Sequence, residues 1–150
     1  MLVGGTLNDV EFLDGTCQEV FTDCNESSDF TFQTQADATA ASQALLDSVF
    51  LGVYDTATSL TRGCTELPPE DVTCHALTPF GFQDALPMQM NASNLTGLDD
   101  LVTGPFSDTD TFRPDLTWAT WSLSEVPEPG SLALFSLGLL GLGVVRRRAA

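Results

Sequence analysis

Alternating apolar and polar positions predict β-strands near both ends of the first 123 residues. The first run ends at Asp14-Gly15, which is a turn signal. Phe30 and Phe32 alternate with polar residues and are expected on one face of a strand. The last run is rich in β-forming residues. The predicted strands cover residues 6–13, 19–22, 29–34 and 116–123, and their spacing predicts an antiparallel meander.

The hydrophobic period changes to that of a helix between residues 36 and 53. Thr34, with Asp37 three residues later, is typical of a helix N-cap, and Gly52 stands where a helix could end. A second, short helix is predicted near residues 94–102. The predicted class is α+β: a small antiparallel β-sheet with one main helix, followed by a separate C-terminal helix of transmembrane type. The stripe of the main helix consists of Ala41, Leu45, Leu46, Val49, Phe50 and Val53.

The C-terminal tail combines three features in a fixed order. Prolines on both sides of Glu128 hold that short segment near polyproline II and leave it extended. An uncharged apolar run at 131–145 follows, and as a helix it would reach roughly 20 to 25 Å, close to the thickness of a bilayer core. A final basic cluster would stay on the cytoplasmic side and leave residues 1–129 outside. In sequence, the tail reads Val126-Pro127-Glu128-Pro129-Gly130, then the apolar run, then Arg146-Arg147-Arg148.

This tail resembles the PEP-CTERM sorting signal of exopolysaccharide-producing Gram-negative bacteria. The resemblance implies an exosortase, a membrane peptidase, as the partner that recognises and cleaves the Pro127-Glu128-Pro129 motif. It also implies passage through the inner membrane, with the bilayer contacted by residues 131–145, and then a place at the cell surface or in the extracellular matrix. Exopolysaccharide is a further candidate partner. Similar tails are catalogued as ice-binding protein C-terminal domains, a label that describes the tail and not an activity.

These features divide the chain into three parts. Residues 1–123 are expected to form an acidic extracellular α+β domain, residues 124–130 are a linker with the Pro-Glu-Pro motif, and residues 131–150 are the hydrophobic helix with its arginine stop. The chain has 21 acidic and five basic residues and a net charge of −16. Three of the five basic residues belong to the tail. Nucleic-acid binding is excluded, because neutralising phosphates needs basic side chains.

The four cysteines are expected to form disulfides, because the tail directs the domain to an oxidising compartment. Of the three possible pairings we favour the local one, Cys17 with Cys24 and Cys64 with Cys74. A zinc site is the alternative, although the close Cys-x-x-Cys spacing of structural zinc sites is missing.

The first residues lack the basic and apolar regions of a secretory signal peptide. Because export requires such a signal, we expect the chain to be truncated at its N-terminus. Without an upstream extension, an unprocessed tail-anchored membrane protein would be the better interpretation.

Candidate catalytic chemistry is sparse. His75 is the only histidine and is expected to lie at the surface, without a partner for a triad or a metal centre. The acidic run 107–112 approaches a calcium loop but lacks the glycine and the closing glutamate of an EF-hand. We therefore expect no catalytic residue, metal or cofactor, and a non-enzymatic surface protein. The alternative is an extracellular carbohydrate-active enzyme that uses paired carboxylates.

Overall fold

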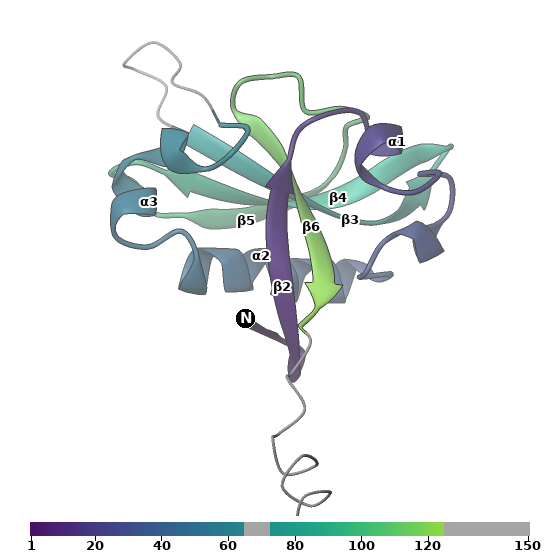
Figure 1. Cartoon of the computed structure of the whole chain (residues 1–150), viewed down its shortest axis with the longest axis horizontal. Helices are drawn as coiled ribbons and strands as arrows, with labels where there is room; N and C mark the ends of the chain where they lie inside the picture. Colours follow the sequence, from purple (N-terminus) through teal and green to yellow (C-terminus); the bar gives the residue numbers. More distant parts are fainter. Residues whose placement is uncertain (65–72, 125–150) are drawn as a thin grey trace, which may run out of the picture.

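The computed structural model describes residues 1–64 and 73–124. These residues form one six-stranded sheet in the order β1-β2-β6-β3-β4-β5. Neighbouring strands are antiparallel except β6 and β3, which run parallel. The sheet curls, so that β2 and β6 cross the direction of β3, β4 and β5 (Figure 1). The strands are β1 (Leu2–Val3), β2 (Thr6–Leu13), β3 (Thr73–Gln83), β4 (Leu86–Leu95), β5 (Leu101–Ser107) and β6 (Leu116–Leu123).

The expected small antiparallel sheet with one main helix is therefore wrong as a fold class. The molecule is mainly a curled, mixed sheet resembling half a barrel, with few helices. The parallel contact arises because β6 enters between β2 and β3, pairing Leu77 with Trp118 in one direction and Val10 with Trp121 in the other. Such long-range insertion cannot be seen in the alternation of a single strand.

Helix α2 (Gln35–Ser48) packs against one face of β3, β4 and β5. It begins where the sequence predicts: the Thr34 hydroxyl accepts from the backbone N–H of Asp37 at 3.2 Å and donates to the Asp37 carboxylate at 2.7 Å. It ends at Ser48, before the predicted residue 53. Beneath it, small side chains on adjacent strands let the helix approach closely, and the buried set includes Ala41, Leu45, Phe50, Ala76, Ala92, Ala119 and Trp121.

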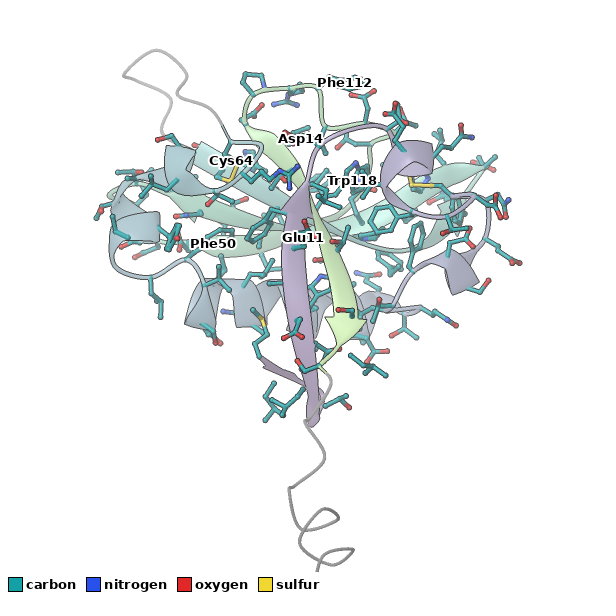
Figure 2. All side chains as sticks on the ribbon, viewed as in Figure 1. Glu11, Asp14, Phe50, Cys64, Phe112 and Trp118 are labelled. Carbon is teal, nitrogen blue, oxygen red and sulfur yellow. A yellow bond between two sulfur atoms is a disulfide. The ribbon has the colours of Figure 1, made fainter. Side chains whose placement is uncertain are left out.

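Trp118 belongs to a second apolar cluster, on the other face of β6. This is expected from strand alternation, because Ala119 and Trp121 point into the first cluster, beneath α2. Trp118 is fully buried and its indole N–H donates to the carbonyl of Gly15 at 3.0 Å. Figure 2 shows Trp118 near the disulfide-bonded loop and Phe50 on the other side of β2. The rest of this cluster is Cys17, Cys24, Phe30, Leu77 and Leu116.

Two predicted strands are absent from the described residues. Residues 19 and 20 belong to the short helix α1 (Cys17–Val20), and residues 21–22 follow it. This turn is helical because the Thr16 hydroxyl accepts from the Glu19 backbone N–H, and the Glu19 carboxylate accepts from the Thr16 backbone N–H. Residue 29 ends the 3₁₀ turn η1 (Ser27–Asp29), and residues 30–34 follow it without forming a strand. There Phe30 packs into the Trp118 cluster and Phe32 against the α2 cluster, so the two rings serve different cores and not one strand face.

The helix predicted at 94–102 is also wrong, because its ends belong to β4 and β5. The long β3–β4 hairpin was not predicted. Its two-residue turn uses Asp84 and Ala85, both with positive φ (51° and 65°), and not the Asn-Gly or Asp-Gly pair that signals such turns. The remaining short elements are α3 (Val53–Thr56) and η2 (Thr58–Leu60).

The predicted transmembrane-type helix is not supported. Within residues 1–64 and 73–124, none of the helices has both the length and the apolar character needed to span a bilayer. The sorting motif, the run 131–145 and the arginine cluster lie outside the described residues.

Candidate functional site

The candidate site lies on the sheet face opposite α2. Ala76, Ala92 and Val102 face the helix, so their neighbours along each strand point to the other side. The register places His75 of β3 opposite Ser93 of β4, and Asn91 opposite Thr103 of β5. Three neighbouring strands thereby bring polar side chains together that are far apart in the sequence.

These side chains line a pocket of about 430 Å³. The volume lies within the range of roughly 300 to 1,000 Å³ that is usual for small-molecule sites. One part of the lining is polar and consists of His75, Asn91, Ser93, Thr103, Asp108 and Arg113. The other part is apolar and consists of Leu77, Leu95, Leu101, Phe106 and Leu116.

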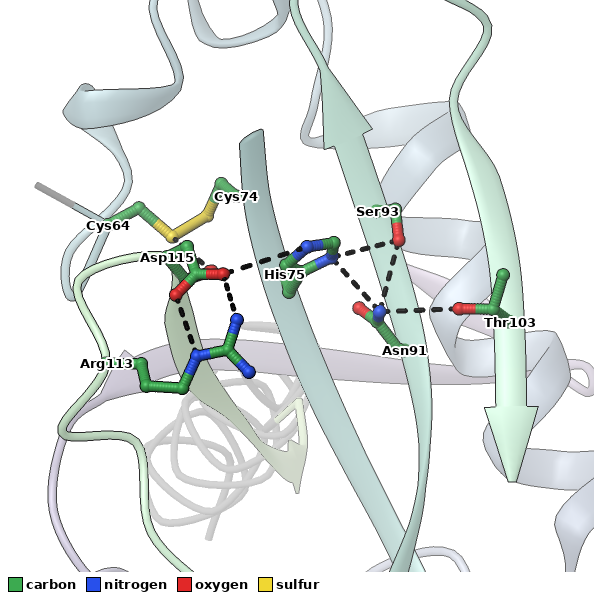
Figure 3. A network of polar contacts seen from close by, with 8 residues as sticks. All are labelled: Cys64, Cys74, His75, Asn91, Ser93, Thr103, Arg113 and Asp115. Carbon is green, nitrogen blue, oxygen red and sulfur yellow. Dashed lines mark hydrogen bonds and ion pairs between the residues drawn. A yellow bond between two sulfur atoms is a disulfide. The ribbon is translucent and has the colours of Figure 1, made fainter. Parts of the chain in front are cut away.

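A hydrogen-bond network connects the polar residues (Figure 3). The Asn91 side-chain N–H₂ donates to Ser93 Oγ at 3.1 Å and to Thr103 Oγ1 at 3.3 Å, and it lies 3.1 Å from His75 Nδ1. His75 Nδ1 lies 3.0 Å from Ser93 Oγ, and which of the two atoms donates depends on the imidazole tautomer.

Asp115 is held by Arg113 and not by the histidine. The Arg113 guanidinium donates to both carboxylate oxygens, at 3.2 Å from Nε and 2.6 Å from Nη2. His75 Nε2 is 4.0 Å from Asp115 Oδ2, which is too long for a hydrogen bond. Burial lowers the pKa of His75, and the nearby Asp115 carboxylate opposes this shift only in part.

Ser93, His75 and Asp115 stand in the order of a nucleophile, a base and an orienting carboxylate. Their geometry does not suit that chemistry, because Ser93 is only 4 % exposed and Asp115 is already committed to Arg113. The distance from His75 Nε2 to Asp115 Oδ2, 4.0 Å, is also longer than the 3.0 Å from His75 Nδ1 to Ser93 Oγ. The arrangement is better suited to binding a molecule than to activating a serine.

The structure brings the four cysteines together in the expected local pairs, Cys17–Cys24 and Cys64–Cys74. The second disulfide directly precedes His75 and fixes the start of β3 beside Asp115, whose carbonyl accepts from the His75 N–H at 2.8 Å. The sequence predicted a surface histidine; in the structure the His75 side chain is 25 % exposed, lines the pocket and contacts Ser93 and Asn91.

Asn91, Ser93 and Thr103 were missed from the sequence. The signal for Asn91 and Ser93 would have been the alternation of polar and small residues along β4, but this pattern resembles that of a solvated strand. The acidic run 107–112 contributes Asp108 to the pocket. Across the part of the chain that the structure describes, no three histidine, cysteine or carboxylate side chains are grouped as metal ligands would be.

Comparison with known families concerns the tail. Residues 125–148 match the family model of the PEP-CTERM protein-sorting motif. The chain carries a PEP-CTERM sorting signal. The match includes the predicted Val126–Gly130 motif and Arg146–Arg148. PEP-CTERM signals are recognised by exosortases and imply membrane passage followed by export to the cell surface or the extracellular space. No curated protein and no solved structure gives a significant match to the chain.

Proposed function

We propose that the chain is a non-enzymatic protein of the cell surface or extracellular matrix, released from the membrane when an exosortase cleaves at Pro127-Glu128-Pro129. The match of residues 125–148 to the sorting motif carries this proposal. Two disulfides support it, because they form and persist in the oxidising compartments that lie beyond the cytoplasmic membrane. The host would be a Gram-negative bacterium.

Mass spectrometry of the protein from envelope and medium fractions tests the processing step. In a host with an exosortase, we expect a mature C-terminus near Glu128. In the same host without the exosortase gene, the intact end at Ala150 should accumulate in the envelope. A matched variant, Glu128→Gln, keeps the prolines and the apolar run and tests whether the exosortase recognises the carboxylate. An intact Ala150 in the exosortase-positive host would exclude the proposed processing and favour a tail-anchored protein.

The non-enzymatic part of the proposal rests on the geometry of Ser93 and Asp115. Its test is hydrolysis of p-nitrophenyl acetate and of p-nitrophenyl glycosides by the wild-type chain, beside Ser93→Ala and His75→Gln. We expect no turnover above buffer in any of the three. Turnover by the wild-type protein that either substitution abolishes would show that the network is an active site.

A further inference from the structure

Strand β2 has an open edge over most of its length. The short strand β1 pairs with Thr6 and Leu7, and Met1 extends this contact to Asn8. Among the described residues, the rest of β2, residues 9–13, has a strand on one side only, which is β6 (Figure 1). The open side is about five residues or 17 Å long.

The strand register decides which backbone groups face this open side. Asn8 faces β1, since its N–H donates to the Met1 carbonyl at 2.7 Å, and backbone direction alternates along a strand. Val10 and Phe12 therefore turn their N–H and C=O groups to the open side, while the residues between them turn theirs to β6. These four groups form no hydrogen bond with another described residue. Such an unpaired edge is a template for an added strand.

The outer face of this edge is acidic. Asp9 and Glu11 are exposed and project from the same face of β2, because they are two residues apart. The Glu11 side chain is 67 % exposed and lies 3.5 Å from Arg62 (Figure 2). No described cation lies within salt-bridge distance of Asp9. The edge therefore has a net negative charge and complements a basic partner.

The same carboxylates disfavour a second copy of the chain as the occupant. Antiparallel pairing of two β2 edges about Val10 would set Asp9 opposite Glu11 of the other copy, and pairing about Glu11 would set Glu11 opposite itself. Like charges directly opposite each other in a ladder are destabilising. Each copy also carries a net charge of −16.

The inner face of the edge is apolar. Val10 and Phe12 pack against the α2 cluster, and the Phe12 ring stacks on Phe50 with centroids 5.7 Å apart. Both side chains remain half-buried, so apolar side chains of an added strand would extend this cluster. An occupant that fits both faces alternates apolar and basic residues.

We propose that the open edge of β2 binds an extended basic segment of another protein, which adds to the sheet as a strand. Val10 and Phe12 supply the main-chain hydrogen bonds, and Asp9 and Glu11 select lysine or arginine at alternate positions. The inference does not rest on the sorting route. The edge belongs to the folded chain whether or not an exosortase cleaves it, so the two proposals can fail independently.

Amide hydrogen exchange, measured by NMR on the full-length chain in non-ionic detergent at low ionic strength, tests the proposal. The probe is the peptide acetyl-Thr-Lys-Val-Lys-Val-Lys-Thr-amide. In one control peptide glutamate replaces each lysine, and in the other proline, which has no N–H, replaces each valine. The edge offers only four backbone groups, so we expect a Kd on the order of 1 mM. At about nine times that concentration, the Val10 and Phe12 amides should exchange about tenfold more slowly, and neither control should slow them.

Matched variants test the role of the charges. Asp9→Asn/Glu11→Gln removes the two carboxylates beside the edge. Asp23→Asn/Asp84→Asn removes two charges elsewhere, at exposed positions whose positive φ asparagine tolerates. We expect the first pair to weaken the basic peptide about three- to tenfold and the second pair to leave its affinity unchanged.

Val10→Pro tests the backbone of the edge. The Val10 N–H faces the open side, where an edge strand tolerates proline. The basic peptide should then no longer protect the Phe12 amide. If Val10→Pro does not fold, the proline-containing peptide tests the same main-chain pairing on the wild-type chain.

Three results would overturn the proposal. The first is no slowing of exchange with the basic peptide at about 10 mM while the spectrum shows the folded chain. The second is equal protection by the glutamate peptide, which would show that the carboxylates select nothing. The third is protection of Val10 and Phe12 before any peptide is added. That protection would reveal a second copy at the edge if it rises with protein concentration, and another segment of this chain if it does not.

Discussion

Reduction of the two disulfides should cost the domain much of its stability. Cys17–Cys24 and Cys64–Cys74 span sequence separations of 7 and 10 residues. Loop-closure entropy at these lengths gives about 2.4 and about 2.7 kcal/mol, so we expect a combined loss of about 5 kcal/mol. Domains of this size are typically stable by only about 5 to 15 kcal/mol. The reduced chain should therefore be marginally folded, which makes correct folding dependent on an oxidising compartment.

Urea unfolding with and without a phosphine reductant measures this loss. Trp118 packs in the same cluster as Cys17 and Cys24, so tryptophan fluorescence reports the loss of that core. With a slope of about 2 kcal/mol/M, the midpoint should fall by about 2.5 M on reduction. The double variants Cys17→Ala/Cys24→Ala and Cys64→Ala/Cys74→Ala separate the two bridges, and their losses should add to that of reduction.

A loss below about 1 kcal/mol on full reduction would refute the loop-entropy reasoning. It would mean that the cores beneath α2 and around Trp118 hold the chain without covalent help. A much larger loss in one double variant than in the other would point to packing of the buried sulfur atoms, and not to the length of the closed loop.

Two further predictions concern a glycine and the histidine. Gly63→Ala should destabilise the fold by about 3 kcal/mol or more, because the φ of Gly63 is +91° and the added Cβ would meet Asp14 and lie 2.8 Å from Thr117. Gly97→Ala, at a φ of +75° with open space around the added Cβ, should cost about 1 kcal/mol. Equal urea midpoints for the two variants would contradict this reasoning. Measured by NMR, the pKa of His75 should lie below the ordinary histidine value of 6.5. Replacing Asp115 by asparagine should lower this pKa further, since the Asp115 carboxylate raises it. Because the unfolded chain binds the proton more readily than the folded chain, the stability that neutral His75 contributes should be present above pH 6.5 and be lost as the pH drops through the folded pKa. If the wild type instead became more stable on acidification from pH 6.5, and His75→Gln did not, the predicted direction of this pH dependence would be wrong.

Local chemistry was predictable from the sequence where it depended on neighbouring residues. The bounds of the strands at 6–13 and 116–123 follow from alternation and β propensity, and the start of α2 follows from its Thr34 cap. The local disulfide pairing and the sorting motif are of the same kind. Each of these signals lies within a few residues of the feature that it predicts.

Features that depend on distant partners were not predictable. Insertion of β6 between β2 and β3 makes the sheet mixed, and nothing in the sequence of β6 indicates its two neighbours. The site depends on the register that sets His75 against Ser93. Asn91 and Thr103 resemble surface residues in the sequence, and only the pairing of β4 with β5 sets them opposite each other. Phe30 and Phe32 alternate as in a strand, yet tertiary packing sends them to different cores.

Strand β6 also sets which way the pocket faces. Leu116, at the start of β6, lines the pocket, and Leu123, at its end, is followed directly by the segment that carries the sorting signal. Eight residues of extended chain place these ends about 23 Å apart. While the chain is held through its C-terminal side, the pocket is thus carried at the distal end of the strand.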